Sequence, residues 1–380
     1  MQVNTKTTES EVTPEIQKPS ELSFFERAYR RLVDQSFSRM TEGCLVIAMP
    51  EGGEMNYGHN PNGQTATIRV HSNQFFRKCV LYGDIGLGEA YVDGDWDTDD
   101  ISAVISWFIL NLNQAPSMSG SNTQSLLMNC LGFVNRIGHL LRPNSLKTSQ
   151  QNIHEHYDLG NDFYKLFLDE TMTYSCGYFG SEKISLKDAQ IAKYELLCQK
   201  LKISEQDHVL EIGCGWGGFA EYAAGKYGCS ITGITISEEQ FQFATNRIAK
   251  AGLSGKVKIR FEDYRLVKGQ FDKIVSIEML EAVGDSYLED YFEQCNRLLR
   301  KDGLLGLQII TCPDPRYDDL RKGTDWTQKH IFPRSLLLAQ HRVAQAMNNT
   351  GQLFLHSWEE FSQSYAQTLK AWHKRFNGSL

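Results

Sequence analysis

The run Glu211-Ile212-Gly213-Cys214-Gly215-Trp216-Gly217-Gly218 decides the fold, because it carries a short apolar strand into a cluster of glycines. Glycine is needed where the backbone turns sharply from a strand into a helix, and where a ligand approaches without a Cβ in the way. The run therefore predicts a strand–turn–helix unit with a ligand held at its turn.

From about residue 190 onward, apolar stretches alternate with helical patterns around this turn. Such alternation with short connections is typical of an α/β fold with a doubly wound, mostly parallel, Rossmann-like sheet. Ligands of such sheets bind outside the carboxyl ends of the strands. Strands are expected at residues 209–212, 230–235, 257–261, 271–277 and 303–310, and helices at residues 218–227, 238–251 and 287–299.

The glycines alone leave the ligand open, because Gly213, Gly215 and Gly218 also satisfy the dinucleotide pattern G-x-G-x-x-G. A dinucleotide site needs an acid at the tip of the second strand to hold the ribose. Here that strand ends in Thr235-Ile236-Ser237, which contains no acid. The sequence therefore favours S-adenosylmethionine over NAD.

Two acidic positions agree with this choice. Glu211 lies just before the turn, where its carboxylate can pair with the ammonium group of a methionine moiety. Asp263 and Tyr264 follow the third strand, and an acid beside an aromatic ring suits an adenine amine and ring face. We therefore predict that these residues bind S-adenosylmethionine.

The chain divides by pattern into four parts. Residues 1–20 are a polar, disordered lead-in, 21–112 form a smaller N-terminal α+β domain that faces lipid, 113–150 are a linker and helix, and 151–380 are the methyltransferase domain. In the N-terminal part we expect strands at 43–47 and 65–71 around a turn at 52–63, helices at 73–84 and 95–112 around a turn at 86–94, and a later helix at 124–141.

Composition limits the classes of function. The net charge of −7 gives no electrostatic reason to bind nucleic acid. Nine cysteines without a C-x-x-C pair predict free thiols in a reducing compartment, and no metal site. No signal segment is recognised, and the longest apolar stretch, 101–112, is too short to span a bilayer.

Local membrane contact could come from two amphipathic segments, 22–37 and 124–141. The first places Phe24 and Phe25 near three arginines, which suits an interfacial helix. The alternative is that its apolar face docks on the next domain, as most amphipathic helices do.

Together, the motifs resemble those of the cyclopropane fatty acid synthases, with the related mycolic acid methyltransferases and plant enzymes. The resemblance extends in order over about 155–370, and residues 83–100 resemble the family's smaller N-terminal domain. The runs that carry it are residues 156–164 (HYDLGNDFY), 172–179 (MTYSCGYF), the glycine turn, 233–237 (GITIS) with Gln240, 278–284 (EMLEAVG), 308–310 (QII), 330–333 (HIFP) and 365–369 (YAQTL).

The resemblance implies a methyl transfer to the cis double bond of an unsaturated acyl chain, followed by loss of a proton to a bound bicarbonate. The bicarbonate would be held by the backbone N–H groups of Cys176 and Ile310 and by the side chains of Glu281, Gln308 and Tyr365. With the residues named above, the donor would contact Tyr174, Ser175, Glu211, Gly213, Cys214, Gly215, Gly217, Thr235, Gln240, Asp263, Tyr264 and Arg265.

Such chemistry needs a dry pocket, because water would quench a cationic intermediate. Aromatic side chains in the matching segments could supply it, or could be ordinary core. A small exchangeable anion also suits the base, since a fixed carboxylate would risk being alkylated. The aromatic candidates are Tyr157, Phe163, Tyr164, Tyr174, Tyr178 and Phe179.

The sequence departs from the family's pattern in two respects. Many bacterial members carry His where this chain has Ala282 and Gln308, and Gln cannot take up charge as His can. Members also usually continue for several tens of residues beyond the Tyr365 segment, so the domain is expected to be short at its C-terminus. Two alternatives therefore stay open, a small-molecule N-methyltransferase and a non-catalytic lipid-binding protein.

The resemblance also sets expectations for partners and location. We expect unsaturated phospholipid acyl chains at a membrane surface as the partner, and no nucleic acid. The protein is expected to be cytoplasmic and transiently at the inner membrane surface, and a homodimer is compatible with the resemblance.

Overall fold

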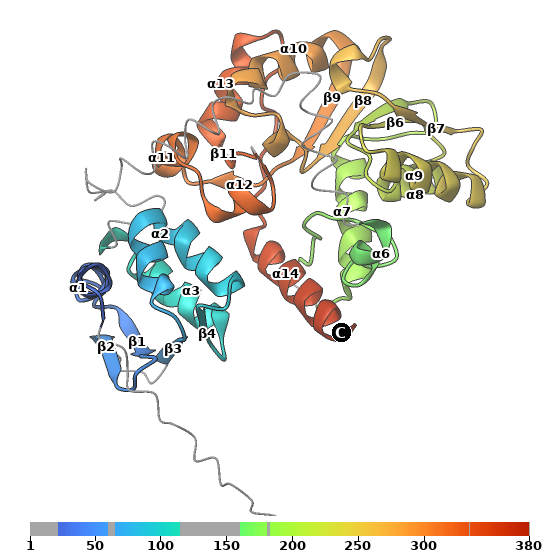
Figure 1. The fold of residues 1–380 in the computed structure, drawn as a ribbon. Helices are drawn as coiled ribbons and strands as arrows, with labels where there is room; N and C mark the ends of the chain where they lie inside the picture. The colour runs from blue at the N-terminus through green and yellow to red at the C-terminus, as the bar shows by residue number, and fades with distance from the viewer. Residues whose placement is uncertain (1–21, 60–64, 115–159, 181–182, 334, 380) are drawn as a thin grey trace, which may run out of the picture. The chain divides into compact units, whose positions relative to one another are not determined.

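The computed structural model describes residues 22–59, 65–114, 160–180, 183–333 and 335–379. The chain divides into two compact units, residues 1–132 and 133–380, each with its own sheet (Figure 1). Within the described ranges, no helix has both the length and the apolar character needed to cross a bilayer.

The first unit is an α+β fold built on a four-stranded sheet in the order β2-β1-β3-β4. β1 runs antiparallel to β2 and parallel to β3, and the alternate residues Leu45 and Ile47 of β1 are fully buried. Helix α1 begins at a capping box of Ser23 and Glu26. The elements are α1 (Phe24–Phe37), β1 (Gly43–Ala48), β2 (Glu54–His59), β3 (Thr65–Val70), α2 (Gln74–Val92), β4 (Trp96–Asp97), α3 (Ile101–Leu110) and the 3₁₀ turn η1 (Leu112–Gln114).

Two expectations for this unit were wrong. The predicted turn at 52–63 contains β2, and helix α2 continues to Val92 through the predicted turn at 86–94. Gly83 carries the kink in α2 with φ 59° and ψ −130°, and a Cβ on Gly86 would lie 2.0 Å from the Lys78 carbonyl oxygen. The glycines therefore bend and pack one helix instead of ending it. The helix expected at 124–141 lies outside the described residues.

The second unit confirms the doubly wound prediction. The five strands of its main sheet are all parallel, in the order β7-β6-β5-β8-β9. The strands are β5 (His208–Ile212), β6 (Ser230–Thr235), β7 (Val257–Phe261), β8 (Phe271–Ile277) and β9 (Leu299–Gln308).

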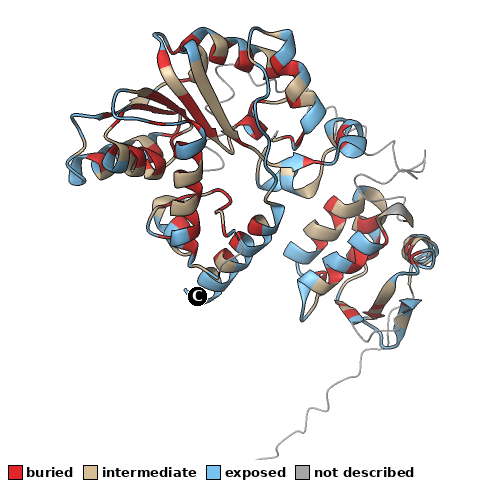
Figure 2. Cartoon of the chain, turned by 180° about the vertical axis from the view of Figure 1, so that it is seen from behind, coloured by how far each residue is buried: buried red, intermediate tan, exposed pale blue. Residues whose placement is uncertain are grey.

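Helices cover both faces of this sheet, and the middle strands are buried between them (Figure 2). One apolar cluster joins α7, α8 and α9 to the sheet, and another joins α10 and α13 to the opposite side. The elements are α7 (Leu186–Lys200), α8 (Gly218–Tyr227), α9 (Glu238–Lys250), α10 (Leu288–Leu298) and α13 (Gln340–Asn349), with 3₁₀ turns η2 (Tyr264–Leu266), η3 (Leu280–Ala282) and η4 (Asp285–Tyr287).

The remaining elements surround the carboxyl ends of the strands. Helix α14 holds the segment around Cys176, because Thr368 Oγ1 accepts the Gly177 N–H at 3.0 Å and Ser364 Oγ accepts the Phe179 N–H at 3.1 Å. The elements are α6 (Gly160–Lys165), β10 (Thr311–Cys312), η5 (Asp314–Arg316), α11 (Tyr317–Lys322), α12 (Trp326–His330), β11 (Leu338–Ala339) and α14 (Ser362–Asn377).

Candidate active site

A cavity of about 780 Å³ lies in the second unit, where the segments that follow β5, β6, β8 and β9 converge. This is where a doubly wound sheet binds its ligands. Residues 172–175, helix α12 and helix α14 complete its wall. The cavity is therefore formed by the segments that the sequence singled out.

The glycine turn lines this cavity with strained backbone that suits glycine. Gly213, Gly215 and Gly217 all have positive φ, at 78°, 52° and 82°. A Cβ on Gly213 would lie 3.0 Å from Met279 Cγ. Gly213 and Gly215 line the cavity, whereas Gly217 caps helix α8 behind it. Gly217 was predicted to contact the donor, but it does not line the cavity, and its positive φ shapes the turn into α8.

Glu211 lies within β5 beside the turn, and it is only 3% exposed. Its Oε2 has no hydrogen-bond partner among the described residues, and burial raises the pKa of its carboxyl group to about 8. A buried acceptor without a partner is costly unless a ligand supplies one. A cationic donor such as S-adenosylmethionine fits this site, because its ammonium group would supply that partner.

The other residues predicted for the donor lie at the same end of the cavity. Thr235 Oγ1 donates to Gln240 Oε1 at 2.9 Å. The Arg265 guanidinium donates two hydrogen bonds to the Asp263 carboxylate, at 2.8 and 2.6 Å. Asp263 remains a candidate acceptor for an adenine amine. Tyr174, Ser175, Glu211, Gly213, Cys214, Gly215, Thr235, Gln240, Asp263, Tyr264 and Arg265 all line the cavity.

The five residues predicted to hold bicarbonate also come together, but their donors are already used. The Cys176 N–H and Gln308 Nε2 both donate to Glu278 Oε1 at 2.8 Å, and the side chain of Tyr365 is hydrogen-bonded to the same carboxyl group. The Ile310 N–H donates to Glu281. An external bicarbonate does not fit this arrangement, because two carboxyl groups of the chain take its hydrogen bonds.

Sequence reasoning missed the role of Glu278, although the residue stood in one of the quoted runs. The available signal was an acid directly after the fourth parallel strand, three residues before Glu281. Acids at that position point to the edge where Glu211 also lies. The expectation of a mobile anion in place of a fixed carboxylate concealed this signal.

Lys193 was also missed. It is 2% exposed, and its Nζ donates to Ser175 Oγ at 2.6 Å. Burial lowers its pKa to about 8, against the opposing effect of Glu278. The sequence signal was a lysine on the buried face of α7 between Ala189 and Leu197, because a buried lysine is rare unless paired.

The aromatic wall differs from the expected one. Tyr174 lines the cavity, whereas Phe163, Tyr164, Tyr178 and Phe179 do not, and Tyr157 lies outside the described residues. Besides Tyr174, the glycine turn and the helix that follows it, the aromatic residues that line it are Phe167, Tyr194, Tyr264, Tyr287, Phe332, Tyr365, Trp372 and Phe376. Tyr174 lies between two of them, stacked on Phe332 at 6.1 Å and 5.3 Å from Trp372.

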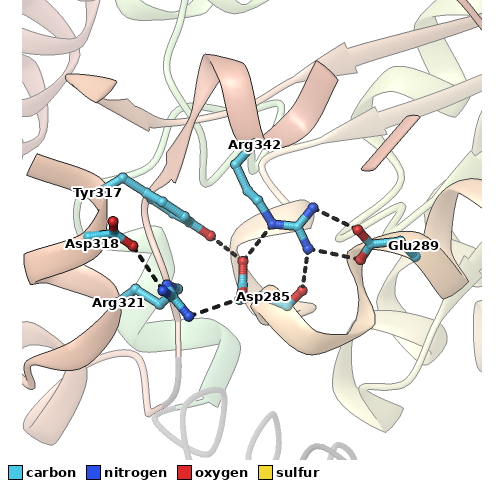
Figure 3. A network of polar contacts seen from close by, with 6 residues as sticks. All are labelled: Asp285, Glu289, Tyr317, Asp318, Arg321 and Arg342. Atoms are coloured by element: carbon cyan, nitrogen blue, oxygen red, sulfur yellow. Dashed lines mark hydrogen bonds and ion pairs between the residues drawn. The ribbon is translucent and has the colours of Figure 1, made fainter. Parts of the chain in front are cut away.

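An ionic network fixes the segment that covers one side of the cavity (Figure 3). Arg342 of α13 donates to Asp285 at 2.8 Å and makes a bidentate pair with Glu289 at 2.8 Å. Asp285 also accepts from Tyr317 at the start of α11. Helix α11 supplies Leu320 to the cavity wall, so the network holds this wall to η4 and α10.

The parallel sheet, the glycine turn and the unpartnered acid beside it define an S-adenosylmethionine-dependent methyltransferase. Comparison with known proteins identifies the family. Residues 144–380 match the family model "Mycolic acid cyclopropane synthetase". The chain belongs to this family, and the resemblance in its sequence motifs is confirmed.

Individual relatives agree. The chain is 36% identical to the cyclopropane-fatty-acyl-phospholipid synthase of Escherichia coli (strain K12), over 82% of this chain and 76% of the relative. It is 35% identical to the tuberculostearic acid methyltransferase UfaA1 of Mycobacterium tuberculosis, over 79% and 70%. Among solved structures, the mycolic acid cyclopropane synthase CmaA1 complexed with SAH and CTAB matches with a TM-score of 0.56 and 28% identity, over 62% of this chain and 84% of that one.

Proposed function

We propose that the protein transfers a methyl or methylene group from S-adenosylmethionine to the cis double bond of an unsaturated acyl chain of a phospholipid. The product is a cyclopropane or a methyl-branched chain. The observation that carries the proposal is that one cavity joins the donor end, the carboxyl groups of Glu278 and Glu281, and an aromatic wall. The relatives that are named for acyl substrates support the same substrate class.

The donor supplies an electrophilic methyl group when bound. The chain's own residues then have three tasks. Glu211 neutralises the positive charge of the donor, and the turn at Gly213 and Gly215 lets it approach the backbone. An alkene is a poor nucleophile, so much of the rate must come from holding it against the methyl group in a near-attack geometry.

The aromatic wall performs the second task, which is the exclusion of water. Phe167, Tyr174, Phe332 and Trp372 enclose the cavity beside the carboxyl groups, and aromatic faces stabilise a positive charge that develops on the substrate. The third task is removal of a proton, for which Glu278 and Glu281 are the carboxyl groups in place. No external bicarbonate takes part in this proposal.

The test is mass spectrometry of total fatty acids from a bacterium that lacks such lipids, with and without the chain expressed. A gain of one CH₂ on monounsaturated chains supports the proposal. In vitro, purified protein with labelled donor should label unsaturated phospholipid vesicles and not saturated ones. Donor binding without labelled lipid would overturn the proposal, and labelling of an amine acceptor in its place would indicate an N-methyltransferase.

We also propose that the protein reaches its substrate at a membrane surface, since the double bond of a phospholipid lies deep in the hydrocarbon. Phe24 and Phe25 of α1 are 72% and 68% exposed. Exposed aromatic residues of this kind suit insertion into the interface between water and lipid.

A further inference from the structure

Glu278 fills the position where the family's pattern would place an external anion. Its Oε1 accepts hydrogen bonds from the Cys176 N–H and from Gln308 Nε2, and its carboxyl group is also hydrogen-bonded to Tyr365. The fourth expected donor, the Ile310 N–H, is bound to Glu281. All the hydrogen-bond donors of the predicted cradle are therefore bound to carboxyl groups of the chain.

Electrostatics give the same result. A bicarbonate placed here would add a negative charge beside Glu278, whose own charge already raises the pKa of Glu281. Lys193 is the buried cation that faces Glu278 from α7. One lysine balances one carboxylate, so a further anion would be left without a partner.

The two carboxyl groups differ in their surroundings. Burial raises the pKa of Glu278, and the nearby Lys193 together with the N–H bonds that Glu278 accepts opposes that rise. Glu281 has one hydrogen bond from Ile310, and its Oε2 has no partner among the described residues. Burial, followed by the nearby Glu278, raises the pKa of Glu281 to about 8. Of the two, Glu278 therefore has the surroundings that stabilise a carboxylate, and Glu281 has those of a neutral acid.

The backbone at Glu278 supports a functional reason for this residue. Its φ of 47° lies in the left-handed region, which glycine adopts without strain. A side chain there costs about 1 kcal/mol or more, and such positions concentrate at functional sites. The Glu278 N–H donates to the Gln308 carbonyl oxygen at 2.7 Å, so the surrounding strands hold the strained residue in place.

We propose that Glu278 is the base of the reaction, and that the chain carries its own carboxylate where an external bicarbonate would otherwise bind. This inference rests on the proposed function and identifies its base.

The π electrons of the alkene form the bond to the methyl carbon, and the sulfur–carbon bond breaks with its electron pair left on sulfur. The substrate cation then loses a proton from the new methyl group to Glu278 Oε2, the oxygen that accepts neither N–H bond, and the freed electron pair closes the ring. Nothing is oxidised or reduced, and Glu278 later releases the proton to solvent.

A fixed carboxylate must avoid being alkylated by the donor. The two N–H bonds to Oε1 place electron density in charge-assisted hydrogen bonds, which makes that oxygen a weaker nucleophile.

The experiment uses the full chain with labelled donor and vesicles of a monounsaturated phosphatidylglycerol, in buffer freed of carbon dioxide. The wild-type rate should change less than about twofold when bicarbonate is added. Glu278→Gly suits the positive φ and opens the cradle; it should lose about 100-fold or more in rate, the range for loss of a general base, and regain at least about tenfold with added bicarbonate. Glu278→Gln fills the same space without charge, so it should lose the same activity and not be rescued.

A second measurement does not depend on turnover. Binding of ¹³C-bicarbonate, followed by NMR line width in the donor-loaded protein, should be weak in the wild type and in Glu278→Gln, and stronger in Glu278→Gly. Unchanged donor affinity shows that each variant is folded. If no form labels lipid, the proposed function fails, and the bicarbonate comparison still decides whether Glu278 fills the cradle. The inference is overturned if bicarbonate stimulates the wild type tenfold, if Glu278→Gln keeps wild-type activity, or if the wild type binds bicarbonate as well as Glu278→Gly.

Discussion

Glu211 is buried within β5, whereas Glu278 is partly buried and directly follows the neighbouring strand β8, and both line the same cavity. Glu211 has an oxygen without a partner among the described residues, whereas Glu278 is bound by Cys176 and Gln308 and lies near Lys193. The difference indicates separate roles. Glu211 acquires its charge when a cationic ligand arrives, whereas the hydrogen bonds and the lysine near Glu278 favour its charged form before the ligand binds.

The largest effect is expected at Glu211. Glu211→Gln removes the negative charge that a bound donor would meet, and donor affinity should fall by about 100-fold or more, the usual cost of losing one partner of a buried charge pair. Isothermal titration calorimetry with S-adenosylmethionine measures this change. Glu205→Gln, at an exposed position before the same strand, is the matched control and should bind normally. Equal affinity of both variants would contradict the assignment.

The pH dependence of donor binding sharpens the comparison. Because the pKa of Glu211 is raised to about 8, its carboxyl group is protonated at pH 6–7 and must release a proton when the cation binds. Affinity should therefore rise by up to tenfold per pH unit from pH 6 towards 8. Calorimetry in two buffers of different ionisation enthalpy counts the released proton. In Glu211→Gln this release should disappear, and its persistence there would assign the proton to another group.

Lys193→Met should make Glu278 resemble Glu211. Burial raises the pKa of Glu278 and Lys193 opposes that rise, so loss of Lys193 should raise this pKa further and favour the protonated form of the base. The acid limb of the kcat/KM profile for vesicle methylation should then shift to higher pH, with about a tenfold lower rate at pH 7. Lys187→Met, exposed on the same helix, is the control. An unshifted profile would show that Lys193 does not influence the pKa of the catalytic base.

The ionic network of Arg342, Asp285 and Glu289, which holds one wall of the cavity, can be tested separately. Arg342→Met leaves Asp285 and Glu289 without their shared partner, and the side chain of Arg342 is only 12% exposed. The free energy of unfolding of the second unit should fall by about 2 kcal/mol, between the values for exposed and buried ion pairs. Arg321→Met, whose side chain is 40% exposed, should cost less than about 1 kcal/mol. Thermal denaturation compares the two variants, and equal midpoints would show that Arg342 does not stabilise the second unit more than Arg321 does.

The sequence predicted what local pattern controls. Alternation of strands and helices predicted the parallel sheet, and the residues that follow β5, β6 and β8 came from the ends of recognisable strands. Aromatic wall positions were harder, because Phe167 and Trp372 lie far apart in sequence and meet only through the packing of α14. Periodicity cannot distinguish a ring that faces a cavity from one that faces the core.

Glu278 shows a different limit. Its identity and its strand were both visible in the sequence, but whether its carboxylate receives the Cys176 N–H depends on a contact across 102 residues and on a left-handed φ. Neither follows from local propensity. Lys193 is similar, since its charge is explained only by Ser175 and Glu278 on other segments. The chemistry of the site therefore comes from tertiary contacts, while its location comes from the fold.

The smallest effect is expected in the first unit, which contains neither carboxyl group. Replacing Phe24 and Phe25 by Ser removes two exposed rings from α1, and liposome affinity should fall about fivefold, which corresponds to about 1 kcal/mol of lost apolar insertion. Co-sedimentation with vesicles measures it. Ile109→Ser, on α3 and 62% exposed, controls for general loss of surface hydrophobicity. Donor affinity should stay unchanged, because Glu211 belongs to the other unit. Unchanged vesicle binding would favour the alternative, in which the apolar face of α1 packs on protein and not on lipid.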